Sequence, residues 1–176
     1  MNEDTTINNY EDDLFADLQG YEHKVMLEKA DNIVLGFVTS AGATGAIPVP
    51  FMDAPLIIAQ QVAMMASINT VFKFDVSKDA LKSLATAVIA VSGATFLGRT
   101  VVANLLKFIP IKGSIVGGAI SAATAGLITL AMGKAYIEIC KLIRMGELDV
   151  DDLTNKTGAD ALKIAFMEQL RKNKDN

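Results

Sequence analysis

The stretch GSIVGGAISAATAGLITLAMG, residues 113–133, is the part of this chain that decides its fold. It carries no charge, and its small residues recur every four positions, a spacing that places them along one side of a helix. Two adjacent rows of small residues make a smooth stripe on which another helix backbone can lie closely. We therefore predict helix-packing or interaction positions at Gly113, Gly117, Gly118, Ser121, Ala122, Ala125 and Gly126.

The same stretch is about as long as the roughly 20 residues that a helix needs to cross a bilayer. Its many Gly, Ser and Thr residues make insertion into lipid marginal, however. Residues 54–72 pose a similar question, because a helix that is apolar nearly all round is buried either in protein or in lipid. Two alternatives stay open: core helices of a bundle, or helices embedded in a membrane.

Prolines mark two corners between apolar helices. In AIPVPFMDAP, residues 46–55, Pro48 and Pro50 bias the residues before them toward extended backbone. Asp53 is a good N-cap, and Pro55 falls in the first turn of the next helix, where its missing N–H is tolerated. Pro110 marks the second corner. We interpret all five residues as structural corners and not as a site.

The remaining pattern predicts helices throughout. No alternating strand pattern is present, so we predict an all-α fold, a compact bundle of four to five helices built from two apolar helical hairpins. Residues 1–8 are expected to be disordered. Helices are expected at residues 9–19 (ending at Gly20), from Tyr21 to the first corner, at 54–72, from a Ser77 cap to about 108, from 113 to about 145, and from a Thr157 cap onward.

Charge is concentrated at the two ends of the chain. Hydrophobic residues make up 51% of the 176 residues, which is enough for a single core. No charged residue occurs in 32–52, 54–72, 83–98 or 113–133. We therefore divide the chain into an acidic, partly disordered segment (1–20), an apolar helical core domain (21–145), and an acidic linker with a C-terminal amphipathic helix (146–176).

Composition also excludes some functions. The net charge of −4 argues against nucleic acid as a partner. Cys140 is the single cysteine, so a disulfide framework is excluded and a reducing compartment fits best. The acidic N-terminus is not a secretory signal. We expect a protein that is cytoplasmic or on the cytoplasmic side of the inner membrane, and not secreted.

One segment matches a phosphate-binding loop in part. Residues 93–100, GATFLGRT, follow the pattern G-x-x-x-x-G-K-[ST], except that Arg99 replaces the lysine. A planar guanidinium substitutes poorly for the compact ammonium that contacts the β and γ phosphates. Nucleotide binding therefore remains a third hypothesis, behind a helix with small residues at a close contact.

No residue pattern predicts catalysis or metal binding. His23 is the single histidine and has no ligand cluster near it in sequence. Asp149, Asp151 and Asp152 resemble the start of a calcium loop, but its later ligands are missing, so a turn or helix cap is favoured. Cys140 has no base at a recognisable spacing. We predict no catalytic residue, no cofactor and no metal.

Three segments resemble a family of uncharacterised bacterial hydrophobic helical domains. They are AIPVPFMDAPLIIAQQVAMMASI (46–68), the stretch from GATFLGRT to LLKFIPIKGS (93–114), and GGAISAATAGLITLAMGKAYIE (117–138). Members often lie C-terminal to Era-like small GTPase domains, and related sequences are described as inner-membrane proteins. The resemblance implies an apolar helical domain without known catalytic residues. This chain has no GTPase motif in its first thirty residues, so any GTPase would be a separate partner.

These observations favour a non-enzymatic, membrane-associated helical module that partners a separate GTPase or another protein. One alternative is a soluble helical module for interaction or homo-oligomerisation. Another is a bundle that inserts into membranes on a trigger.

Overall fold

The computed structural model describes the backbone of residues 3–45, 53–95 and 116–175, and the side chains of 17–41, 56–90 and 125–172. Over these ranges the chain is helical and has no strand, which confirms the predicted all-α fold. The elements are α1 (Glu3–Gly45), α2 (Asp53–Phe72), α3 (Lys78–Thr95), α5 (Val116–Arg144), the 3-10 helix η2 (Val150–Thr154) and α6 (Lys156–Asp175).

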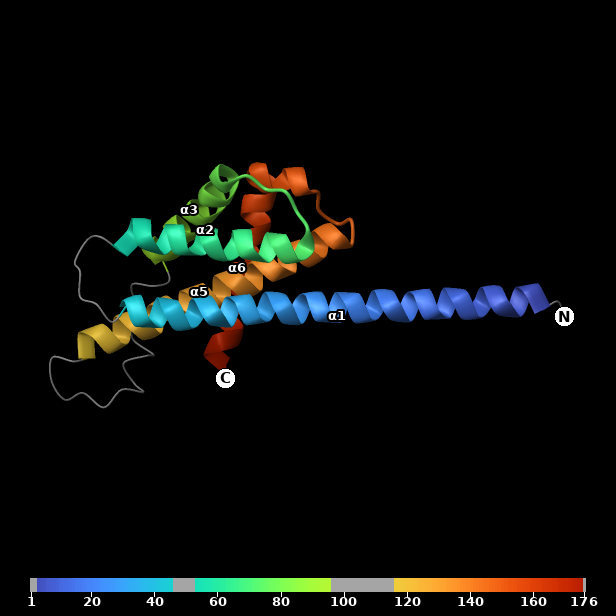
Figure 1. The fold of residues 1–176 in the computed structure, drawn as a ribbon. Coiled ribbons are helices and arrows are strands. Elements are labelled where there is room, and N and C mark those ends of the chain that lie inside the picture. Colours follow the sequence, from blue (N-terminus) through green and yellow to red (C-terminus); the bar gives the residue numbers. More distant parts are fainter. Residues whose placement is uncertain (1–2, 46–52, 96–115, 176) are drawn as a thin grey trace.

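Three long helices form the centre of the fold. Each of α1, α2 and α5 contacts the other two, while α3 packs on α2 and α6 packs on α5 (Figure 1). We expected α3 and α5 to pair as a second hairpin. In the described residues α3 contacts mainly α2, α6 and η2, whereas α5 lies mainly along α1 and α6. The N-terminal half of α1 extends well beyond the other helices (Figure 1).

Helix α1 is one continuous helix, whereas we expected a disordered segment followed by two separate helices. It begins at Glu3 and passes through Gly20 without interruption. A glycine ends a helix when it adopts a positive φ, and among the described glycines only Gly146 does so. Inside a helix a glycine costs only about 1 kcal/mol relative to alanine. Gly20 was therefore a poor stop signal.

In the turn between α2 and α3, helix α3 starts at the predicted cap. Helix α2 ends at a residue with a positive φ that is not a glycine. The backbone N–H of Ala80 donates to Oγ of Ser77 at 3.2 Å, which confirms Ser77 as the cap of α3. Lys73 has φ of 60°, and the N–H of Phe74 donates to the carbonyl of Asn69 at 3.0 Å. This is a Schellman ending in which a lysine takes the place usual for glycine.

The segment before α6 is more ordered than the loop that we predicted for 146–155. It contains η2, and the first residue of α6 is Lys156. The N-cap of α6 is Asn155 and not Thr157, because Oδ1 of Asn155 accepts the backbone N–H of Thr157 at 2.7 Å. The predicted apolar face of α6 is confirmed, since Leu162 and Phe166 are fully buried.

The corner residues are described only in part. Helix α2 begins at Asp53, so Pro55 falls in its first turn as predicted. Pro48, Pro50 and Pro110 lie outside the described residues, as does the predicted continuation of α3 beyond Thr95.

The three central helices come close together at Gly133 of α5. A Cβ built on Gly133 would lie 2.5 Å from Cγ2 of Val34 in α1 and 3.1 Å from Sδ of Met64 in α2. Val34 and Met64 are both fully buried. Any side chain at position 133 would therefore push α1 and α2 away from α5.

We predict that Gly133→Ala destabilises the fold by about 1–3 kcal/mol, because the added methyl overpacks this crossing. Urea unfolding followed by circular dichroism measures the change. The control is Gly36→Ala in α1, where a Cβ would meet nothing within 4 Å. That variant should be neutral or up to about 1 kcal/mol more stable, because alanine favours helix. Equal stability of the two variants would contradict the close contact.

Candidate functional site

Two buried polar pairs cross the contact between α2 and α5. Nε2 of Gln61 donates to Oγ1 of Thr129 at 3.0 Å, and both residues are almost completely buried. The hydroxyl of Tyr136 donates to Oδ1 of Asn69 at 2.8 Å, also in the interior. Each pair joins one residue of α2 to one of α5, so the two helices are linked at two levels of an otherwise apolar interface.

Each pair leaves one amide atom without a hydrogen-bond partner. Oε1 of Gln61 and Nδ2 of Asn69 are buried and unpaired. An unpaired buried polar atom costs about 1–3 kcal/mol, so these pairs add less stability than apolar side chains of the same shape could. Their better-supported role is to select one register of α2 on α5.

The phenol of Tyr136 is held in its neutral form. Burial raises its pKa far above the ordinary value, the nearby Cys140 raises it further, and the Asn69 hydrogen bond opposes this only in part. A neutral, buried phenol that donates to an amide is a structural group. It is not poised as an acid or base.

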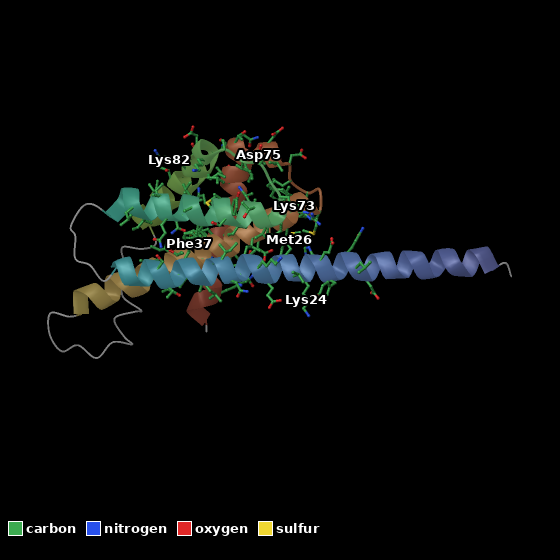
Figure 2. All side chains as sticks on the ribbon, in the orientation of Figure 1. Lys24, Met26, Phe37, Lys73, Asp75 and Lys82 are labelled. Carbon is green, nitrogen blue, oxygen red and sulfur yellow. The ribbon has the colours of Figure 1, made fainter. Side chains whose placement is uncertain are left out.

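Uncharged helix segments lie side by side in three of the described helices. We call residues 32–45 of α1, 54–72 of α2 and 116–133 of α5 the uncharged layer, because none of them carries a charge. The three segments are neighbours: Val34 lies against Gly133, and Gln61 bonds to Thr129. Figure 2 shows Phe37 within this layer, Lys24 and Lys73 displaced toward the other end of the bundle, and Lys82 of α3 at the same end as Phe37.

A surface ion pair marks the edge of the uncharged layer. Nζ of Lys134 lies 2.8 Å from Oδ1 of Asp31, and the two side chains are 40% and 43% exposed. A pair this accessible to water contributes at most about 1 kcal/mol. The position of the pair marks where the uncharged segments end. Lys134 is the first charged residue of α5, and Asp31 is the last charged residue of α1.

Large apolar side chains reach the surface of the uncharged layer. Leu35 of α1 is 56% exposed and Leu56 of α2 is 57% exposed. Single exposed leucines are ordinary on a protein surface. Each stands on a segment without a charged residue, so the uncharged layer exposes one leucine on α1 and one on α2.

The predicted small-residue rows are described at their C-terminal end only. A Cβ on Gly126 would lie 3.8 Å from Cγ1 of Val38, an ordinary contact between α5 and α1, and Ala125 is half-buried. The surroundings of Gly117, Gly118, Ser121 and Ala122, and the whole of Gly113, lie outside what the structure describes. The interaction role of the rows stays a prediction. From residue 125 onward α5 is a core helix, with Ile128, Ala131 and Met132 buried.

The segment before Gly93 does not have the secondary structure that a phosphate-binding loop requires. Such a loop follows a strand, whereas the residues before Gly93 form helix α3. Residues 93–95 continue that helix, and residues 96–100, including Arg99, lie outside the described residues.

The other candidate residues lie apart. His23 is half-buried on α1, and within the described residues no group of three His, Cys, Asp or Glu side chains could hold a metal. Asp149 and Asp152 form a capping box at η2, in which the Asp149 N–H donates to Oδ2 of Asp152 at 3.1 Å. Hydrogen bonds from the Asp149 backbone and Asn155 lower the pKa of Asp152. This confirms the predicted helix cap.

A family model described as a domain of unknown function, DUF697, matches residues 12–170. The chain belongs to the DUF697 family. This confirms the predicted resemblance to a family of uncharacterised helical domains. The match includes every described helix at least in part, so the polar pairs and the uncharged layer both lie within the DUF697 region.

One curated relative of this DUF697 chain is magnetosome membrane protein 22 of Magnetospirillum gryphiswaldense. The two are 25% identical over 149 residues, which cover 82% of this chain and 70% of the relative. No solved structure matches the chain at a significant level. Among the described helices, none has both the length and the apolarity to span a membrane.

Sequence reasoning missed the polar pairs and Gly133. Gln61 and Asn69 are two of the few polar residues in an apolar helix, and their partners on α5 are 68 and 67 residues away in the chain. The available signal was the presence of polar residues in a helix that is apolar nearly all round.

We predict that Tyr136→Phe destabilises the fold by about 1–3 kcal/mol, because Oδ1 of Asn69 then loses its partner in the interior. Combining it with Asn69→Leu should recover most of that loss, since both polar groups are then removed. Urea unfolding gives each value. Thr86→Ala, which removes an exposed hydroxyl bonded within α3, should stay within about 0.5 kcal/mol. A double variant as unstable as Tyr136→Phe would contradict the pairing.

We predict that Cys140 is unreactive in the folded chain. Its thiol is fully buried, and burial raises its pKa, so little thiolate forms near neutral pH. Ellman's reagent should label it slowly in buffer and stoichiometrically in urea. Rapid labelling of the native chain would show that the thiol is accessible and activated.

Proposed function

We propose that this chain is a non-enzymatic helical module that associates with a membrane through the uncharged layer. The adjacency of three uncharged helix segments is the observation that carries the proposal. Residues 32–45, 54–72 and 116–133 adjoin one another and contain no charge. Asp53 and Lys73 flank the α2 segment, and the Lys134–Asp31 pair lies at the edge of the other two.

This arrangement suits association without a spanning helix. Apolar surface gains free energy on leaving water, at about 25 cal/mol per Å², whereas a charge placed in lipid is strongly unfavourable. The uncharged layer offers leucines at positions 35 and 56 and requires no charge to be desolvated. The polar groups of the layer that lie in the α2–α5 contact, Gln61, Asn69 and Thr129, face the protein interior and so do not oppose contact with lipid.

The relative's name supports the same proposal, because the similarity to a magnetosome membrane protein extends over 82% of this chain. The absence of a metal cluster in the described residues, the buried thiol and the neutral phenol give no support to an enzyme. We place the module on the cytoplasmic side of the inner membrane. The resemblance to domains attached to Era-like GTPases favours a separate GTPase as its partner.

We predict that Leu35→Lys together with Leu56→Lys reduces membrane binding by about tenfold or more, because two charges then enter the contact with lipid. Flotation with phosphatidylcholine–phosphatidylglycerol vesicles measures binding. The matched control is Met145→Lys with Ile164→Lys, since these side chains are 61% and 69% exposed but lie outside the uncharged layer. The control should float like the unchanged chain.

Equal flotation of the two double variants would refute the assignment of the uncharged layer. Failure of the unchanged chain to float, with a monodisperse peak in detergent-free buffer, would favour the soluble interaction or homo-oligomer module instead. Release of a dye from the vesicles would identify triggered insertion.

A further inference from the structure

The N-terminal half of α1 extends beyond the other described helices (Figure 1). The first α1 residue that packs against the core, among the described side chains, is Met26. Residues 3–25 form a helical overhang of about 35 Å that projects away from the other helices (Figure 1). We call this segment the α1 overhang.

A helix of this kind needs packing to be stable. Isolated helices gain little from propensity alone, and in proteins most helical stability comes from burial of an apolar face. The overhang also contains Gly20 in its interior, where a Cβ would meet nothing within 4 Å. Since none of the other described helices covers most of it, we infer that its stability as a helix depends on a partner.

Two exposed apolar side chains lie together on the overhang, and we call them the apolar stripe. Leu18 and Tyr21 are 54% and 68% exposed and, at a spacing of three, lie on one face of α1. The sequence places Ile7, Tyr10 and Leu14 ahead of them at spacings of three and four, which continues the same register. This is the pattern by which an amphipathic helix pairs with another helix.

The stripe faces away from the body of the protein. Tyr21 and the fully buried Ala30 are nine residues apart, which is about two and a half helical turns and places them on opposite sides of α1. A partner on the stripe would therefore lie on the side of α1 that α5 does not occupy, and it would not displace the core.

Charge identifies the kind of partner. Residues 1–22 contain the acidic residues Glu3, Asp4, Glu11, Asp12, Asp13, Asp17 and Glu22 and no Lys or Arg. A second copy of the overhang would bring these carboxylates together, and an anionic lipid surface would repel them. A helix with Lys or Arg beside its apolar face would pair with them.

We propose that the α1 overhang is a docking helix for a basic amphipathic helix of a separate protein. Leu18 and Tyr21 supply the apolar contact, and the acidic residues around them select a basic partner. The proposal rests on α1 alone and does not require the uncharged layer to bind lipid.

A peptide assay on the full chain, free of lipid, tests the proposal. The probe is a fluorescent peptide of about 25 residues with Leu at alternating spacings of three and four and Lys on both flanks. A second peptide replaces each Lys with Glu. We expect the Lys peptide to raise the fluorescence anisotropy at low salt, to bind more weakly at 500 mM salt because charges are screened, and to outcompete the Glu peptide.

Paired variants identify the surface. Leu18→Asp with Tyr21→Asp should weaken binding of the Lys peptide by about tenfold or more, because the apolar stripe is lost and negative charge is kept. Ile164→Asp on α6, where the side chain is 69% exposed, should leave binding unchanged. Circular dichroism on each variant confirms that the core is folded.

Several results would overturn the proposal. These are no binding of the Lys peptide, equal binding of both peptides, or equal binding by the unchanged chain and the Leu18–Tyr21 double variant. Sedimentation that shows a dimer lost in that double variant would assign the stripe to a second copy instead. Failure of vesicle flotation alone would refute the uncharged layer and leave the overhang proposal standing.

Discussion

The fold depends on the absence of a side chain at Gly133. At this position α5 approaches α1 through Val34 and α2 through Met64 so closely that a single methyl group would not fit. All three central helices therefore meet at this position. The Gln61–Thr129 and Tyr136–Asn69 pairs lie on either side of it along α5, so the crossing and the polar pairs together set how α2 lies on α5.

The polar pairs restrict how these helices can slide. A shift of α2 by one helical turn, about 5.4 Å, would separate both pairs at once and leave four polar groups buried without partners. Apolar side chains alone tolerate such shifts better, because any leucine or methionine can fill a neighbouring space. The interface thus exchanges some stability, visible in its two unpaired amide atoms, for one defined arrangement.

Much of this fold follows from local sequence, and the rest depends on contacts between distant residues. The Ser77 cap, the charge-free run that became α2 and the apolar face of α6 are signalled within a few residues. The uninterrupted α1 was not predicted, because Gly20 ends a helix only when its backbone turns left-handed. The neighbours of α5, and the clearance at Gly133, depend on which helices meet, and residue spacing within one helix carries no information about that. The candidate site shows the same division: the uncharged segments can be read from the sequence, but their adjacency cannot.

The length of α1 gives the molecule a mechanical property. The helix is held against the core over the stretch from Met26 to Val38, and residues 3–25 extend from it as one arm. At 1.5 Å per residue this arm is about 35 Å long. Because the packed stretch and the arm belong to one continuous helix, a tilt of the arm acts directly on the packed stretch. A rigid rod of this geometry connects the acidic tip of the protein to the part of α1 that lies in the uncharged layer.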